Sequence, residues 1–494
     1  MICVQALVER AGNDGAAHEP YRAFREWCRA DLARAREVVD AAFQDDALAG
    51  SFLSFALEAG SFVDIAKEFV SSYSDKRQLA AVCALGRCSY STASQANEAL
   101  SAILNAQRDC SDDALCANSL VSALTISNAL PAADSSLVQA IVRLACEAEG
   151  AQTRFFCGRM LWQFSTGLSR PIIQNLLNVL SSLDPSEKGT IRELDLGLQK
   201  LLKTDCADLA IDFVETLLIS AKGGIRLAQL DRFGKELSTT SRHHLGGVVV
   251  RWLLLGESVL CDGLHEVMRE VEGGGKVLEL DLKKLNLSAA ETVFLSRKAV
   301  GYLFFQPVTA ASMLVSALRI QDNRIIDDVR DLLLSALLVN FGGALVNYLD
   351  SIDEEDPAYS DVRWALEQNE QYLSDFNSIG EIKELWPSDY QRQIERRRAS
   401  EEGREIQKMA EKKSVFFGLV KRSTILYGNR TLAYVDDQEG KRRPIEIEMK
   451  SFGATIELPR ALIVDPVGLD YMLRVFRAER LKHEIDHSRL PGLT

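Results

Sequence analysis

Three residues near the end of the chain have the types and spacing found in zinc-dependent hydrolases. His483, Glu484 and His487 form an H-E-x-x-H pattern. On a helix, histidines four residues apart share one face and can hold zinc, while the glutamate can polarise a metal-bound water. Such a site needs a third ligand, and the residues after His487 include no histidine, aspartate or glutamate. We therefore expect no catalytic residue and no metal site, and a hydrolase is the third of three functional hypotheses.

Two further motifs resemble ligand sites, and both favour a structural interpretation. "EGGGKV" (272–277) has the glycines and lysine of a phosphate loop, but valine stands where serine or threonine would hold magnesium. "SRHHLGG" (241–247) contains adjacent histidines, which point about 100° apart on a helix and cannot converge on one ion. The first motif predicts a turn and the second the start of a helix. We expect no cofactor.

Basic side chains cluster near the C-terminal end. Residues 391–494 hold 21 basic and 16 acidic side chains, a net charge of +5, whereas the whole chain has a net charge of −13. The candidates for contact with nucleic acid or an acidic partner are Lys421, Arg422, Lys441, Arg442, Arg443, Arg474 and Arg477. Interleaved aromatics such as Tyr427 and Tyr434 can stack on bases. The alternative interpretation is a solvated charged face with the aromatic rings in a strand core.

An acidic belt lies directly before this basic region. Residues 350–389 contain 12 acidic side chains and only two basic ones, a net charge of −10. Three partners for the basic region therefore stay open: nucleic acid, an acidic protein, and the chain's own acidic belt.

The cysteines and apolar runs indicate where the chain resides. All ten cysteines lie between Cys3 and Cys261, none forms a C-x-x-C pair, and most have apolar neighbours at helical spacing. This is typical of buried, reduced thiols in a reducing compartment. The start "MICVQALVERAGNDG" lacks the basic region of an export signal. The charge-free run 332–349 contains asparagines and glycines, so it predicts a buried helix instead of a membrane span. We expect a cytoplasmic protein.

Paired helices are the elements expected to carry these residues from about residue 20 to 350. The apolar spacing predicts helical pairs at 76–88 with 94–107, 112–129 with 134–149, 152–165 with 170–183, and 187–203 with 207–222. First helices recur every 35 to 40 residues, the interval at which two-helix repeats stack into solenoids. "VLELDLKKLNL" (277–287) alternates enough to be a strand or an insertion.

A family resemblance follows from the first of these pairs. "DKRQLAAVCALGRC" (75–88), with its small residues and late Gly86, resembles the first helix of a HEAT repeat, and "DDALCANSLVSAL" (112–124) resembles it less closely. The resemblance covers about residues 75–222. HEAT-like repeats imply a protein scaffold without chemistry of its own.

The apolar period changes from 3.6 to 2 after Ser414. "TILY" and "RTLAYV" flank Gly428-Asn429, and "PIEIEM" and "ATIEL" follow, which predicts a four-stranded antiparallel meander. Asp465 and Pro466 then begin a helix with an apolar stripe. The expected fold is mostly α: a solenoid of stacked helical hairpins (1–350), an acidic segment with a polar linking helix (351–413), and a small β-plus-helix module with a flexible tail (414–494).

The leading functional hypothesis is a non-enzymatic scaffold or adaptor. Its helical repeats would present an acidic surface to protein partners, and its C-terminal module would dock a partner or a second copy of the chain. The alternative is a nucleic-acid-binding accessory factor that uses the basic C-terminal region. We expect no membrane partner.

Overall fold

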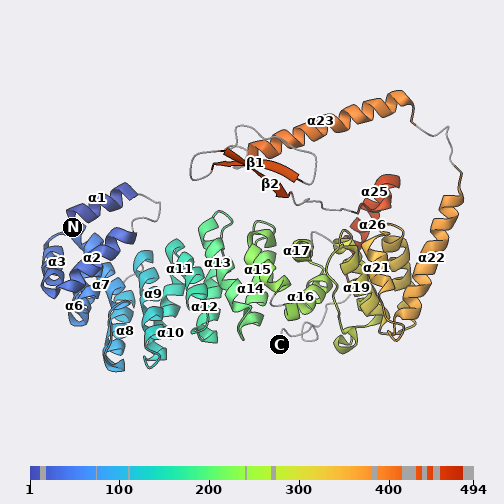
Figure 1. Ribbon diagram of the computed structural model, residues 1–494. Coiled ribbons are helices and arrows are strands. Elements are labelled where there is room, and N and C mark those ends of the chain that lie inside the picture. The colour runs from blue at the N-terminus through green and yellow to red at the C-terminus, as the bar shows by residue number, and fades with distance from the viewer. Residues whose placement is uncertain are drawn as a thin grey trace.

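Most helices of the computed structural model stack side by side in one row (Figure 1). The structure describes residues 1–11, 18–73, 75–108, 112–148, 150–239, 242–268, 274–380, 387–413, 430–436, 442–448 and 457–481. The first part of the row comprises α1 (Ile2–Ala11), α2 (His18–Ala30), α3 (Leu32–Gln44), α4 (Asp46–Leu48), the π-helical η1 (Ala49–Leu53), α5 (Ser54–Ala59), α6 (Val63–Ser72), α7 (Lys76–Leu85), α8 (Ala93–Arg108), α9 (Asp113–Ala129), α10 (Ser135–Glu147), α11 (Ala151–Gln163), α12 (Arg170–Leu180), α13 (Lys188–Leu201) and α14 (Ala207–Ser220).

The row continues with shorter and less regular elements. These are the 3₁₀ turn η2 (Leu227–Gln229), α15 (Asp231–Ser238), α16 (Arg242–Leu255), α17 (Ser258–Met268), the 3₁₀ turn η3 (Leu282–Leu285), α18 (Ala289–Leu303), α19 (Pro307–Leu318), α20 (Ile326–Asp331), the π-helical η4 (Leu332–Leu338), α21 (Ala344–Asp350) and α22 (Tyr359–Ser378). After the row, the chain continues with α23 (Asp389–Lys413), β1 (Arg430–Asp436), β2 (Arg442–Glu448), α25 (Arg460–Val464) and α26 (Pro466–Ala478).

The predicted helical pairs and their recurrence are confirmed. The first helices α7, α9, α11 and α13 begin at residues 76, 113, 151 and 188, which are spaced by 37, 38 and 37 residues. Aspartates begin several of these helices as N-caps: the Asp134 carboxylate, for example, accepts from the Ser136 amide at 2.8 Å. Because caps and apolar spacing are local signals, they place these helices without knowledge of the fold.

Within this helical row, the first helices of successive hairpins pack on one another, and so do the second helices. These two lines of helices are here called the first row and the second row. The first row runs through α7, α9, α11, α13, α15 and α17, and the second row includes α6, α8, α10 and α12 in sequence. Helices of the first row are buried on most sides, as in α9, whereas α10 buries one stripe and exposes the rest. The stack therefore leaves one face of many second-row helices open to solvent.

A close approach between α11 and α13 requires glycine. A Cβ added at Gly197 would lie 2.6 Å from the Leu161 Cβ and 3.3 Å from the Gly158 carbonyl oxygen. The missing side chain lets the two helices pack closely. Gly189, in the same helix, has no such neighbour, because its Cβ would meet nothing nearer than 3.8 Å.

Polar bonds between neighbouring hairpins repeat along the row. The Asp113 carboxylate of α9 accepts from the Gln152 amide at 2.8 Å and the Thr153 amide at 3.0 Å, and so caps α11 of the next hairpin. Burial raises the pKa of Asp113, because it opposes ionisation of the carboxyl group. Hydrogen bonds from the Thr153 hydroxyl and from the Gln152 and Thr153 amides have the larger combined effect and hold the pKa below its ordinary value. Asp195 of α13 caps α15 in the same way. Residues joined by side-chain hydrogen bonds between hairpins are separated in the sequence by about one repeat. The separation is 33 residues for Arg154 and Glu187 and 40 residues for Asp113 and Thr153.

Several sequence expectations have definite outcomes here. As predicted, Cys116 is buried, and Cys28, Cys88, Cys146, Cys157, Cys206 and Cys261 are buried free thiols. Residues 277–281 form no strand and lead into η3, so this stretch is an insertion between helices. The run 332–349 is mostly buried, as predicted, although Ser335 and Asn347 are exposed, and it is interrupted at residues 339–343 between η4 and α21. Among the described residues, no helix combines the length and apolar character needed to span a membrane.

The predicted C-terminal meander is wrong. The described part of this region has one antiparallel pairing, β1 with β2, in which Arg430 lies opposite Glu448 and Asp436 opposite Arg442. "TILY" lies outside the described residues, and at the end of "ATIEL" Glu457 and Leu458 are not in a strand. Instead, the Glu457 carboxylate is held by backbone amides of the helical row. A tertiary contact therefore overrides the alternating pattern, and mostly α describes the fold.

The glycine contact in α13 gives a first prediction. Gly197→Ala should lower the free energy of unfolding by about 1–3 kcal/mol, because the added methyl group overpacks the contact with Leu161. Gly189→Ala is the matched control and should leave stability unchanged or raise it by up to about 1 kcal/mol through helix propensity. Urea denaturation of both variants measures the difference. Equal effects at the two positions would show that the α11–α13 approach does not limit packing.

Candidate functional site

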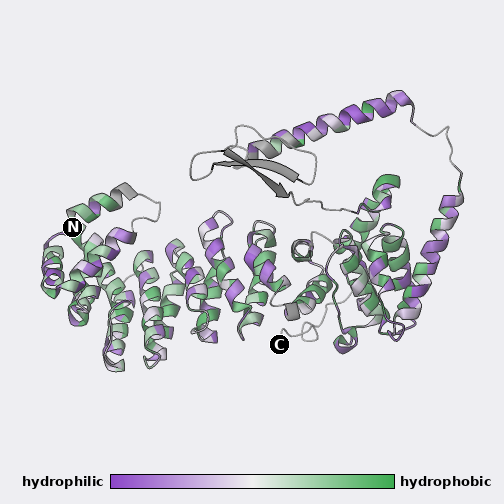
Figure 2. Ribbon diagram, in the orientation of Figure 1, coloured by the Kyte–Doolittle hydropathy of each residue, from purple (hydrophilic) through white to green (hydrophobic). Residues whose placement is uncertain are grey.

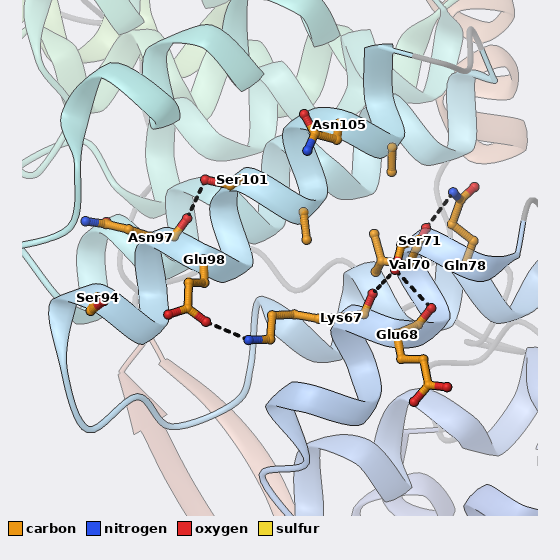
Figure 3. A pocket seen from close by; sticks show the side chains of 12 residues that line it. Lys67, Glu68, Val70, Ser71, Gln78, Ser94, Asn97, Glu98, Ser101 and Asn105 are labelled. Atoms are coloured by element: carbon orange, nitrogen blue, oxygen red, sulfur yellow. Dashed lines mark hydrogen bonds and ion pairs between the residues drawn. The ribbon is translucent and has the colours of Figure 1, made fainter.

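A groove on the described surface lies between α6 and α8 (Figure 3). It has a volume of 670 Å³ and an apolar floor that includes Val70, Ala102 and Ala106. On α8, Ser94, Asn97, Glu98, Ser101 and Asn105 line it at spacings of three, one, three and four residues, so they form one stripe along the helix. The groove is thus the junction between two neighbouring hairpins, lined mainly by amide, hydroxyl and carboxylate groups.

Most polar groups of the groove are already bonded within the protein. Lys67 reaches across from α6 and donates to the Glu98 carboxylate at 2.7 Å, a bond that raises the pKa of the lysine. The Ser71 and Ser101 hydroxyls donate to carbonyl oxygens of their own helices, and Gln78 donates to the Val70 carbonyl. These bonds, drawn in Figure 3, fix the walls of the groove.

Ser94 and Asn105 remain accessible at the groove. Both side chains are exposed, and no hydrogen bond within the described structure joins either of them to another residue. An amide and a hydroxyl can each donate to and accept from a polypeptide backbone. Glu68 adds a carboxylate on the α6 side. The groove therefore offers a shaped, hydrogen-bonding and acidic surface.

The basic candidates predicted from the sequence are used in different ways. Lys421, Arg422 and Lys441 lie outside the described residues. Arg442 and Arg443 begin β2, where they lie opposite Asp436 and Val435. Arg474 is exposed and pairs with Asp470 at 2.8 Å. Arg477 is half-buried, and its Nε donates to the Gly301 carbonyl at 2.6 Å. In the described part of the chain, the arginines of α26 thus serve contacts within the protein.

The other motifs have structural roles or lie beyond the described part. His483, Glu484 and His487 are outside the described residues. Arg242 begins α16, which confirms the predicted helix start. Gly274 and Gly275 adopt positive φ angles of 75° and 113°, as a turn requires, and Lys276 donates to the Ser238 carbonyl. No group of three histidines, cysteines or carboxylates among the described residues is arranged to hold a metal ion.

The sequence did not predict that the chain returns to the helical row at residues 457–481, here called the return segment. Its hydrogen bonds reach back 114 to 182 residues, far beyond one repeat. At its start, the Glu457 carboxylate accepts from the Gly342 and Gly343 amides at 2.7 Å each. The Asn340 side chain then accepts from the Ala461 amide at 2.8 Å. These bonds fasten the segment to the break between η4 and α21.

A buried lysine fastens the other end of the return segment. Lys298 of α18 is fully buried, and its Nζ donates to the Arg477 carbonyl at 2.6 Å, at the C-terminus of α26. A cation is favourable there because helix C-termini carry partial negative charge. The guanidinium of Arg477 also lies over the Tyr302 ring, 5.4 Å from its centre. Leu469 and Leu473 are buried beneath α26, so charge and apolar contacts hold this helix against the helical row.

The opposite face of the return segment is apolar and exposed. Exposed side chains on α25, α26 and the residues around them are Leu458, Leu462, Ile463, Val464, Val467, Tyr471 and Val475. Four of them, Ile463, Val464, Val467 and Tyr471, are more than 70% exposed. Figure 2 shows α25 in the colour of hydrophobic residues at the outside of the molecule. Exposed large apolar side chains gathered in this way mark an interaction surface, and the Asp470–Arg474 ion pair lies among those of α26. The sequence contains a sign of this patch in the apolar run Leu462–Val464 and in Val467, Tyr471 and Val475, which follow at intervals of four residues.

The contact beneath α26 gives a second prediction. A Cβ at Gly301 would lie 3.0 Å from the Phe476 Cβ and 3.3 Å from the Arg477 amide nitrogen, so Gly301→Leu should push α26 outward. Amide hydrogen exchange in α26 should accelerate at least about tenfold, because overpacking costs on the order of 1–2 kcal/mol. Gly403→Leu in α23, where an added Cβ meets nothing within 4 Å, is the control. Unchanged exchange in α26 would contradict the proposed docking.

The buried lysine gives a third prediction, on pH. Burial, together with nearby Arg480, lowers the pKa of Lys298 from 10.5 to about 8, while Cys261 and Glu479 act in the opposite direction. Between these values the unfolded chain holds a proton that the folded chain has released, so the free energy of unfolding should rise as pH increases. Urea denaturation at pH 7 and pH 10 should show this rise relative to Lys298→Met. If the free energy of unfolding changes equally with pH in the wild type and in Lys298→Met, the rise does not come from Lys298 and the prediction is wrong.

No protein-family model, curated protein or solved structure matches this chain. The groove, the return segment and the helical row that holds them are therefore the features from which we infer a function.

Proposed function

We propose that this chain is a non-enzymatic scaffold that binds protein partners through the surface of HEAT-like helical repeats. The observation that carries the proposal is the neighbour-to-neighbour stacking of the hairpins, which leaves faces of many second-row helices exposed over a long distance. Extended surfaces of this kind suit the binding of partner proteins. A cytoplasmic location, where the buried cysteines stay reduced, is part of the same proposal.

The α6–α8 groove is the best candidate for one binding position. Its apolar floor can bury side chains, and Ser94 and Asn105 can bond the backbone of a segment that lies along it. Its carboxylates, Glu68 and Glu98, together with the overall charge of −13, favour a partner segment with basic side chains. The acidic repeat surface expected from the sequence thus has a specific place in this proposal.

The C-terminal docking element of this proposal is helical. The exposed faces of α25 and α26 take the role that the sequence suggested for a β module. The alternative, nucleic-acid binding, would depend mainly on Lys421, Arg422, Lys441, Arg442 and Arg443, because Arg474 and Arg477 make contacts within the chain.

A groove variant with a matched control tests the proposal. Proteins captured from the native host on the wild-type chain would be identified, purified and measured by calorimetry. Ser94→Arg with Asn105→Arg should weaken direct binding at least tenfold, about 1.4 kcal/mol, by filling the groove with positive charge. Gln139→Arg with Asn178→Arg adds the same charge at exposed positions of α10 and α12 and should not weaken it.

Two results would contradict this proposal. If both double variants weaken binding equally, the groove is not the contact surface. If the purified chain binds no protein directly but retains single- or double-stranded nucleic acid with an affinity that falls steeply with salt, the alternative function is favoured.

A further inference from the structure

The last helix of the row extends beyond the helix on which it packs. Arg330 of α20 pairs with Asp361 and lies over the Trp364 ring, so α22 runs alongside α20 and η4 from this point. The element η4 ends at Leu338, but α22 continues past this end as far as Ser378. Burial on α22 accordingly ends at Asn369. Residues 370–380 are here called the α22 overhang.

The face of α22 that packs on its neighbour remains apolar along the overhang. Val362, Leu366 and Asn369 are buried, and Leu373 and Phe376 follow at the same spacing of three or four residues. Phe376 is 54% exposed and Ile379 is 64% exposed. The Tyr372 ring stacks on the Phe376 ring, with 6.4 Å between the ring centres, and widens the apolar surface. This is a packing face without a helix to cover it.

A second uncovered apolar face belongs to α25 and α26, and the same end of the row carries both. The return segment is tied to the end of η4 at Asn340 and Gly343, and α22 passes this end as the overhang (Figure 1). Both faces are fixed to the row and remain exposed, so neither covers the other within one chain.

The two faces are complementary in charge. Glu367 and Glu370 are exposed beside the apolar surface of α22, and the described structure shows no ion pair for either. Arg460 is exposed beside Leu462 and Ile463, and within the described residues it makes no ion pair either. Burying the two apolar faces against each other would bring unpaired carboxylates toward an unpaired guanidinium.

We propose that a second copy of this chain covers these faces. The α22 overhang of one copy packs on the outward face of α25 and α26 of the other, and the same contact forms in return about a two-fold axis. Each copy carries both halves of the contact, so two reciprocal contacts close the dimer and leave no free end for further growth. The proposal rests on the C-terminal docking element of the proposed function, for which it names a second copy of the chain as the occupant, and it does not use the α6–α8 groove.

Sedimentation equilibrium of the full chain over a range of concentrations tests the proposal. The wild-type chain should be a dimer. Phe376→Asp with Ile379→Asp alters the overhang, and Ile463→Asp with Val467→Asp alters the outward face of the return segment. Each pair should weaken dimerisation at least about tenfold, because a charge would be buried in an apolar contact. These four side chains are exposed, so unfolding curves should stay close to that of the wild type.

Mixing the two variants gives the sharpest result. A mixed dimer keeps one intact contact, between the unaltered overhang of one chain and the unaltered outward face of the other. It should therefore form more tightly than either variant alone and less tightly than the wild type. Glu370→Arg should also weaken the dimer, and adding Arg460→Glu should restore it at least in part. This charge exchange leaves the apolar residues unchanged.

Any one of the following outcomes would overturn the proposal. They are a wild-type chain that stays monomeric up to about 100 μM, a dimer that none of these variants weakens, and a mixture that associates no better than its components. Binding of a different protein to the outward face by a monomeric chain would identify that protein as the occupant and reject the second copy. A monomer that still binds partners through Ser94 and Asn105 would leave the proposed scaffold function intact.

Discussion

Each helical hairpin of this chain can bury its apolar faces only against the hairpins before and after it. This constraint explains why Gly197 must lack a side chain, because α11 and α13 are the first helices of adjacent hairpins and pack against each other. It also explains why Asp113 and Asp195 cap helices of the following hairpin. A buried helix start needs a partner for its amides, and the neighbouring hairpin is the nearest source. Stability therefore accumulates from junctions between neighbours.

The return segment is the departure from this rule within the described structure. It joins residues near 477 to residues near 300, which no neighbour contact could do. The chain must bury the amine of Lys298 to make this contact, and the helix C-terminus of α26 offsets part of the cost by accepting from that amine. The result is a helix with one face held firmly and the opposite face presented outward.

The candidate binding surfaces follow from what this packing leaves uncovered. A second-row helix such as α8 buries one stripe and leaves another, with Ser94 and Asn105, beside the groove. The final helix α22 has no following hairpin, so its overhang keeps an apolar face exposed. Uncovered apolar surface in water is unfavourable, and association with another protein surface removes it. The same constraint that builds the row thus creates the places where partners or copies can bind.

The sequence by itself determined the helices of the row, their recurrence and the start of α26 at Asp465 and Pro466, because caps and apolar spacing act over one or two turns. It predicted a meander where Glu457 instead binds the amides of Gly342 and Gly343. The apolar stripe of α26, which includes Leu469 and Leu473, was also evident in the sequence from its helical spacing. Only the tertiary structure decided that this stripe is buried on α18. That contact depends on a surface provided by residues far earlier in the chain, as in the hydrogen bond from Arg477 to Gly301, which lies 176 positions before it.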